Sequence, residues 1–183
     1  QPKALLRIGG QSFIRRIIGV LNHPAIEHII AVLGADAALV QEDIKGLTVK
    51  SVINEHYRHG QLSSLIMGIK EAERFQPGGI IVHPVDHPLV AAETVGALVE
   101  RFLLQSPGIV VPTFRGRRGH PVIFSSSLFR ELKQAPVSIG ARAVVWAHKD
   151  AVVEVPCGDA GVVTNINTQD EYANLQRPLQ SPA

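Results

Sequence analysis

Residues 79–89 read GIIVHPVDHPL, and the first part of this stretch, Gly79 to Pro84, is the most strand-like segment of the chain. A short apolar run bounded by glycine and proline is typical of a strand buried on both faces, as in a sheet covered by helices. After it, Asp86 stands in a polar turn between Pro84 and Pro88, which restrict the backbone on either side. The stretch therefore predicts a buried strand that carries a carboxylate to the edge of a sheet.

On both sides of this stretch, helical apolar stripes alternate with short strand-like runs. We predict helices over 14–21 (behind Ser12), 35–42, 62–69, 95–103, 128–134 and 141–148, strands over 28–34, 47–52, 109–112, 121–125 and 152–155, and a last short helix opened by the capping box Thr168-Gln169-Asp170-Glu171. This alternation, without an internal repeat, favours a three-layer α/β/α sandwich with a Rossmann-like, mostly parallel sheet. Ligands of such sheets bind beyond the carboxyl ends of the strands.

Composition narrows the class of protein. The chain has 183 residues, with 18 Lys+Arg against 16 Asp+Glu and a net charge of +2, which fits one domain and argues against nucleic acid as the main partner. The longest apolar run, residues 29–40, is well short of the roughly 20 residues of a bilayer span, so we expect no membrane partner. Cys157 is the only cysteine, which excludes an intramolecular disulfide and favours a reducing, cytoplasmic setting. We expect the ligand to be a small anion.

Asp86 is the first candidate for chemistry. A carboxylate held rigidly beyond a strand suits Mg²⁺, which requires oxygen ligands and close geometry. The alternative is that Asp86 only forms the turn or caps the next helix. His83 and His87 are four residues apart with a proline between them, which excludes a helical metal-binding pair and favours packed or solvated side chains.

Three further polar segments are candidates. Gly60, Ser63 and Ser64 lie at the start of a predicted helix, where backbone N–H groups favour a phosphate; the alternative is that Ser63 is a plain N-cap. The loop TFRGRRGHP at 113–121 carries arginines that match phosphate oxygens or are simply solvated. Further along, the segment 165–167 reads Asn-Ile-Asn, and in an extended backbone its two amides share one face. There they either supply a neutral oxygen to the cation at the Asp86 turn or are turn asparagines.

Taken together, these segments resemble the nucleotidyltransferase superfamily, in particular the molybdenum cofactor cytidylyltransferases and related MobA-like proteins. The matching strings, which run in family order between Gln1 and about Leu175, are PKALL at 2–6, GQLSSL at 60–65, VDHPL at 85–89, RRGHPVIF at 117–124 and GAR at 140–142. The string at 117–124 is the most specific, and it points to the cytidylyltransferase branch over the guanylyltransferases. The resemblance implies a nucleotide-diphospho-sugar transferase-like fold over residues 1–176, followed by a flexible tail over 177–183.

The sequence departs from the family pattern in two places. The family's first strand and its Gly-rich nucleotide loop have no counterpart in the sequence, so we expect both to lie before Gln1 in the protein. The cytidylyltransferase branch usually carries Asp-Ile-Asp-Thr where this chain has Asn165-Ile166-Asn167-Thr168. Guanylyltransferase relatives often carry the asparagine form, and replacing a carboxylate with an amide removes a charge from the cation site.

The resemblance implies a Mg²⁺-dependent enzyme that transfers CMP from CTP to the phosphate of a molybdopterin-type cofactor and releases pyrophosphate, with a molybdoenzyme as recipient of the product. It implies Lys3 and Asp86 as catalytic residues, and Asp86 and Asn167 as metal ligands, with Asn165 a weaker candidate. The residues implied to contact nucleotide or substrate are Lys3, Gly60, Ser63, Ser64, Pro84, Asp86, Arg118, Gly119, His120 and Arg142. Two alternatives stay open: transfer from GTP or to another phosphorylated acceptor, and a non-catalytic molybdopterin-binding or chaperone module.

Overall fold

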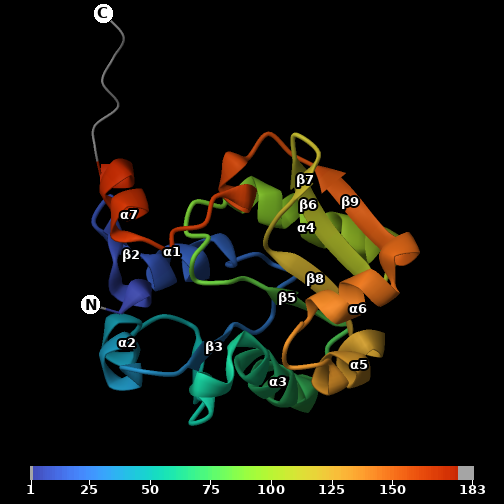
Figure 1. Ribbon diagram of the computed structural model, residues 1–183, viewed down its shortest axis with the longest axis horizontal. Coiled ribbons are helices and arrows are strands. Elements are labelled where there is room, and N and C mark those ends of the chain that lie inside the picture. Colours follow the sequence, from blue (N-terminus) through green and yellow to red (C-terminus); the bar gives the residue numbers. More distant parts are fainter. Residues whose placement is uncertain (1, 177–183) are drawn as a thin grey trace, which may run out of the picture.

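The computed structural model describes residues 2–176, and it shows strands in the middle of the molecule with helices on both sides (Figure 1). The strands are β1 (Arg7–Ile8), β2 (Gln11–Ser12), β3 (Ile30–Leu33), β4 (Lys50–Ile53), β5 (Gly79–Val82), β6 (Ile109–Phe114), β7 (Arg117–Arg118), β8 (Val122–Ser125) and β9 (Val152–Pro156). The helices are α1 (Phe13–Val20), α2 (Ala37–Asp43), α3 (Gln61–Ala72), α4 (Ala92–Gln105), α5 (Phe129–Gln134), α6 (Arg142–Ala147) and α7 (Gln169–Gln176). Every predicted helix and strand has a counterpart among them.

The largest sheet has the order β5-β8-β6-β7, with β9 beside β6. β9 runs parallel to β6, whereas β8 runs antiparallel to both β5 and β6. The sheet is therefore mixed, where the sequence pattern predicted a mostly parallel one. The reason is the connection from β6 to β8, which turns back through β7 without a helix, and a connection of that length returns the chain antiparallel.

Two short elements escaped sequence analysis. β1 and β2 form a hairpin in which Gly9 and Gly10 both have positive φ, at 56° and 85°. A pair of glycines is a known hairpin signal, but the flanking strands are too short to show alternation. β7 pairs with the end of β6 and contains Arg118, so part of the predicted basic loop is a strand. Neither element is long enough to show the periodicity of a strand in the sequence.

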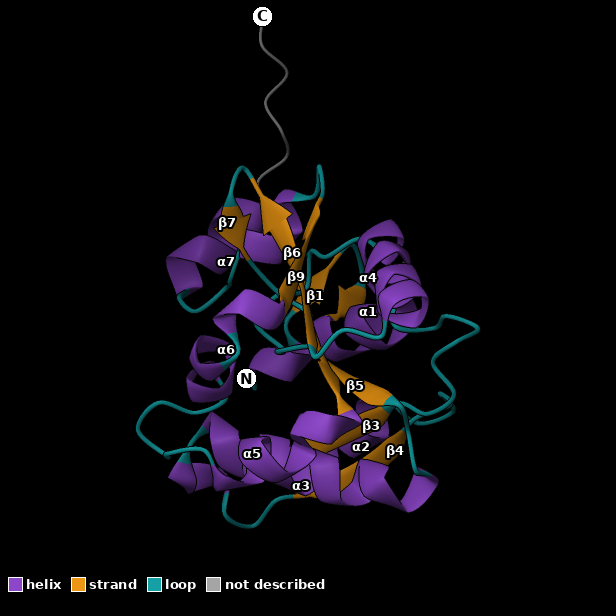
Figure 2. Cartoon of the chain, turned by 90° about the vertical axis from the view of Figure 1, so that its right-hand side faces the viewer, coloured by secondary structure: helices purple, strands orange, loops and turns teal. Residues whose placement is uncertain are grey.

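A slot separates β3 from β5. Among residues 2–176, β3 pairs only with β4, and β5 pairs only with β8, while Figure 2 shows β3 and β4 on the far side of β5 from β6 and β9. The space between them has a volume of about 670 Å³ and is lined by both strands and by apolar side chains of α1, α3 and α4. All four residues of β5 are consequently only partly buried, although the sequence predicts a strand buried on both faces.

The last helix returns to the start of the chain. The Tyr172 hydroxyl donates to the Arg7 carbonyl at 2.8 Å and accepts from the Arg7 N–H at 3.1 Å, and its ring lies edge-on to Phe13. Figure 1 accordingly shows α7 beside β2 and α1. The predicted capping box is confirmed, because Glu171 accepts from the Thr168 N–H and Thr168 Oγ1 accepts from the Glu171 N–H.

Two further predictions concern the C-terminal tail and the absence of a membrane-spanning segment. The tail predicted over 177–183 lies outside the described residues. Within residues 2–176, the structure has no helix of the length and apolar character that crossing a bilayer requires.

Candidate active site at the end of strand β5

Asp86 lies just beyond the last residue of β5, as the sequence predicts. Its side chain is 26% exposed, and its Oδ1 lies 3.1 Å from Nδ1 of His87. The hydrogen bond from His87 is the largest cause that holds the pKa of Asp86 below its usual value; burial opposes it, and the charge of Lys3 adds a smaller lowering. Asp86 is therefore an ionised carboxylate at neutral pH, which is the state that a cation site needs.

The Asn-Ile-Asn segment lies directly against this turn. Ile166 is 3% exposed, and its N–H donates to the Asp86 carbonyl at 2.8 Å. Asn165 and Asn167 on either side of it are exposed, which is the alternation that the sequence predicts. The buried isoleucine thus anchors the segment, and the two amides are left on the solvent side beside Asp86.

Lys3 completes a cluster of three segments. Its Nζ donates to Oδ1 of Asn167 at 2.7 Å, although the two residues are 164 positions apart in the sequence. Lys3 begins the 3₁₀ helix η1 (Lys3–Leu5), which contacts α1, and Asn167 is held by its N–H donating to Glu171 at 2.6 Å. The Lys3 ammonium therefore contacts the Asn167 amide directly and lies close enough to Asp86 for its charge to lower the pKa of that carboxyl. In this arrangement the lysine occupies the amide oxygen.

The oxygen donors of this cluster fit a hard divalent cation. A carboxylate offers about four lone-pair positions, of which His87 uses one, and Asn167 adds a neutral amide oxygen. Mg²⁺ in proteins is typically held by one or two carboxylates together with substrate phosphates and water. Among the described residues, no group of three or more His, Cys, Asp and Glu side chains is placed to hold a metal, so a cation here would depend on such shared ligands.

Three histidines pack behind the carboxylate. Burial is the main cause that lowers the pKa of His83 and of His120 to about 4, so both rings are neutral at pH 7. His87 is 8% exposed, and its ring lies edge-on to that of His120 with centroids 4.7 Å apart. Of the two states predicted for His83 and His87, packed or solvated, the structure shows the packed one.

The backbone of the loop before β8 lies very close to the backbone at Val162. A Cβ atom on Gly119 would overlap the Val162 carbonyl oxygen, and the His120 N–H donates to that oxygen at 2.8 Å. The loop therefore rests on the 3₁₀ helix η6 (Ala160–Val163), which leads into the Asn-Ile-Asn segment. Arg118 points elsewhere: its Nε donates to Oε1 of Glu154 at 2.7 Å.

The serines at the start of α3 are held by a residue that sequence analysis missed. Asn54 is 1% exposed, and its Nδ2 donates to the hydroxyls of Ser63 at 2.9 Å and Ser64 at 3.0 Å. Gly60, with φ +91°, is the N-cap, so the alternative that Ser63 is the cap is wrong. The signal for Asn54 was its place directly after a strand. Ser64 and Pro84 both line the slot, so the start of α3 and the turn that carries Asp86 face the same space.

Arg142 is not brought to this cluster. It begins α6, and its guanidinium carbon lies 5.9 Å from the centre of the Trp146 ring. The 3₁₀ helix η1, which Lys3 begins, contacts α1 and α2, and Figure 1 shows α6 on the opposite side of the molecule from α2. A role for Arg142 in substrate binding stays a prediction.

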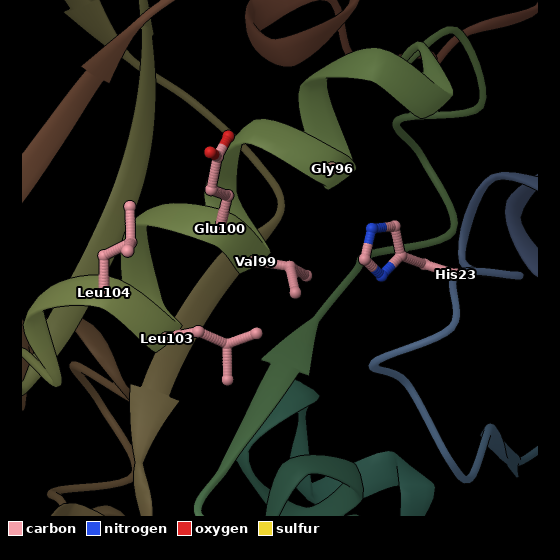
Figure 3. A pocket seen from close by; sticks show the side chains of 6 residues that line it. All are labelled: His23, Gly96, Val99, Glu100, Leu103 and Leu104. Atoms are coloured by element: carbon pink, nitrogen blue, oxygen red, sulfur yellow. The ribbon is translucent and has the colours of Figure 1, made fainter.

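A second hollow lies on the outer face of α4 (Figure 3), with a volume of about 530 Å³. It is lined by His23, Gly96, Val99, Glu100, Leu103 and Leu104. The wall is mostly aliphatic, and none of the predicted site residues contributes to it. The convergence of polar groups at the end of β5 makes that region the candidate active site.

Comparison with known proteins places the sequence among its relatives. Residues 1–152 match the family described as the MobA-like NTP transferase domain. The purine catabolism protein PucB of Bacillus subtilis (strain 168) is 29% identical over 123 residues, which cover 66% of this chain and 58% of PucB. The nicotine blue oxidoreductase of Paenarthrobacter nicotinovorans is 26% identical over 95% of this chain and 87% of that protein. A molybdenum cofactor guanylyltransferase of Cereibacter sphaeroides is 24% identical over 99% and 90%.

Solved structures show the same fold. Rv0371c from Mycobacterium tuberculosis H37Rv matches with a TM-score of 0.80 and 23% identity over 96% of this chain and 88% of that chain, and another crystal structure of it is a complex with manganese. The 2-C-methyl-D-erythritol 4-phosphate cytidylyltransferase from Thermus thermophilus matches with a TM-score of 0.72 and 20% identity over 96% and 92%. The α/β fold class predicted from the sequence is confirmed.

Proposed function

Because this chain belongs to the MobA-like NTP transferase domain family, we propose that it transfers CMP from CTP to the phosphate of a molybdopterin-type cofactor and releases pyrophosphate. The observation that carries the proposal is the contact of Lys3 with Asn167 at 2.7 Å beside the ionised Asp86. A cation, a carboxylate and an amide at the carboxyl end of a strand are the groups that a triphosphate and its metal require. A molybdoenzyme would receive the product.

We propose Asp86 and Asn167 as the ligands of Mg²⁺, with Asn165 as a weaker candidate. Their oxygen chemistry supports this, and so does the manganese complex of the structural relative Rv0371c. The metal, when bound, neutralises phosphate charge. Since Lys3 donates to the amide oxygen of Asn167 in this structure, binding of the metal would move the lysine from Asn167 to the phosphates.

The reaction needs positioning more than it needs a protein nucleophile. An oxygen of the acceptor phosphate attacks the α-phosphorus of the nucleotide, the new P–O bond forms, and the bond to the β-phosphate oxygen breaks to give pyrophosphate. Lys3 would balance the charge that develops on the leaving group. The backbone of Gly60 and Gly119, the Ser63 and Ser64 turn of α3 and the loop at Pro84 would orient the two substrates.

Arg118 is a further candidate for contact with a substrate phosphate. Its guanidinium is paired with Glu154, so contact with a substrate phosphate would require exchange of that carboxylate for the phosphate. The side chains of both partners are more than 40% exposed, at 43% and 45%, and an exposed ion pair of this kind contributes only about 0–1 kcal/mol. The exchange is therefore inexpensive, and we propose Arg118 as a substrate ligand. For Arg142, which is not brought to the cluster, this role rests on the family resemblance alone.

We further propose residues 1–176 as the nucleotidyltransferase domain, completed by the strand and the Gly-rich loop that the family resemblance predicts ahead of Gln1. The slot between β3 and β5 supports this, because it is lined by apolar side chains and faces the unpaired edges of both strands among residues 2–176. A longer chain that includes the preceding residues should protect the amides of β3 and β5 from hydrogen exchange. Unchanged exchange would count against the proposal.

Asp86→Asn tests the proposed activity. The substitution keeps the shape of the side chain and removes its charge, so pyrophosphate release in Mg²⁺ with CTP and a molybdopterin-type acceptor should fall by at least about 10²-fold. Asp36→Asn is the matched control, since Asp36 is exposed and its left-handed backbone suits asparagine. Wild-type turnover in Asp86→Asn would remove Asp86 from the reaction.

A guanylyltransferase is the second candidate. The asparagine pair at 165 and 167 favours it, as does the similarity to the guanylyltransferase of Cereibacter sphaeroides. Turnover with CTP and with GTP, measured side by side on the full-length protein, separates the two. Binding of the acceptor without pyrophosphate release from either nucleotide would indicate the non-catalytic molybdopterin-binding module.

A further inference from the structure

Among residues 2–176, His87 is the side chain that hydrogen-bonds the Asp86 carboxylate, with Nδ1 3.1 Å from Oδ1. Because the carboxylate is ionised and can only accept, Nδ1 must carry the proton. This donor fixes one carboxylate oxygen, while the rest of the carboxylate stays available to another ligand. An N–H of this kind restricts rotation of the carboxylate without competing for the whole of its charge.

His87 is itself held firmly. Its side chain is 10% exposed, its backbone N–H donates to the Pro84 carbonyl at 3.3 Å, and its ring meets the edge of the His120 ring. His120 is fixed in turn by its backbone hydrogen bond to Val162. A continuous line of contacts therefore runs from η6 through two imidazole rings to the carboxylate.

The ring of His120 acts by packing. Its Nδ1 is buried and has no hydrogen-bond partner among residues 2–176, and the ring is neutral at pH 7 because burial lowers its pKa to about 4. Its aromatic neighbour is the His87 ring, which it meets edge-on with centroids 4.7 Å apart. A neutral ring placed in this way supports its neighbour rather than serving as a charged ligand.

We propose that His87 is a positioning residue that orients the Asp86 carboxylate for its cation, and that His120 supports this orientation through the His87 ring. This inference rests on the proposed function only in taking Asp86 as a metal ligand. It assigns His87, which the sequence predicts to be either packed or solvated, to the metal site, and it replaces direct substrate contact by His120 with an indirect role. Second-layer donors of this kind typically change metal affinity roughly 10–100-fold when they are removed.

The test is Mn²⁺ affinity, measured by electron paramagnetic resonance on the full chain without nucleotide. His87→Leu keeps an apolar side chain of similar bulk but removes the donor, and it should weaken Mn²⁺ binding roughly 10–100-fold. His87→Asn places an amide N–H near the position of Nδ1 and should restore most of the affinity. His23→Asn, on the hollow of α4, is the control and should bind Mn²⁺ as the wild type does.

The variant Asp86→Asn distinguishes a failure of the metal assignment from a failure of the positioning role of His87. If Asp86→Asn weakens Mn²⁺ binding but His87→Leu does not, the positioning role of His87 is wrong and the metal assignment stands. If Asp86→Asn leaves the affinity unchanged, both fall together. Should His87→Leu fail to fold by circular dichroism, His87→Gln takes its place, because its longer side chain misplaces the donor; equal affinity in His87→Gln and His87→Asn would overturn the inference.

Discussion

The largest sheet contains strands that are equally apolar but buried to very different degrees. We call β6 and β8 the β6 half of the sheet, and β5, at its edge, the β5 half. In β6, all residues except Phe114 are buried, and β8 is buried except at Ser125. In β5, whose sequence GIIV is just as apolar, all four residues are only partly buried. The difference is that β6 and β8 have partners on both edges, whereas β5 faces the slot. Burial of a strand therefore depends on its neighbours as much as on its own residues.

Paired alanine substitutions should measure this difference. Ile109 in β6 is 0% exposed and Ile81 in β5 is partly buried. Ile109→Ala should lower the free energy of unfolding by about 3–4 kcal/mol, because it leaves a cavity in close-packed surroundings, and Ile81→Ala by about 1–2 kcal/mol. Urea denaturation of the two variants checks the gap. Equal losses would mean that the β5 side of the slot is as well packed as the β6 half.

The same contrast explains what sequence analysis reached and what it did not. Runs such as GIIVHP and the stripe at 14–21 depend on local periodicity, so their elements were predicted. The direction of β8 depends on pairing between distant segments, and no local pattern encodes it. The contact of Lys3 with Asn167 joins the two ends of the domain, and only the family resemblance suggested that the two residues share a site. Asn54 and the packing of His87 on His120 carried no motif.

Two histidines at the border between β5 and β8 should make the free energy of unfolding depend on pH. His83 follows β5 and His120 precedes β8, and the pKa of each is lowered to about 4 by burial. Between pH 4 and the usual histidine value near 6.5 the unfolded chain binds more protons, so stability is full above about 6.5 and falls as the pH is lowered toward 4. Each ring adds a slope of up to about 1.4 kcal/mol per pH unit. Urea denaturation at several pH values measures the slope.

A double variant isolates this contribution. Replacing both rings, His83→Asn with His120→Asn, should flatten the dependence of stability on pH between 4 and 6.5, even if the variant is less stable throughout. The exposed His59 is a suitable control, and His59→Asn should keep the wild-type slope. A double variant with an unchanged slope would assign the acid sensitivity to other groups.

The smallest expected effect concerns α7, which begins two residues after Asn167 of the candidate active site. Thr168 Oγ1 accepts from the Glu171 N–H at 3.2 Å, and Glu171 in turn accepts from the Asn167 and Thr168 N–H groups. Thr168→Ala should therefore lower the stability of α7 by about 1 kcal/mol. The measurement is hydrogen exchange, which should show fraying of α7 and faster exchange at Asn167. The amides of β6 should exchange as in the wild type, because α7 is held through Tyr172 to Arg7 and Phe13, near the start of the chain. Faster exchange in β6 as well would show that the two halves unfold as one unit, and the contrast between them would then be one of packing alone.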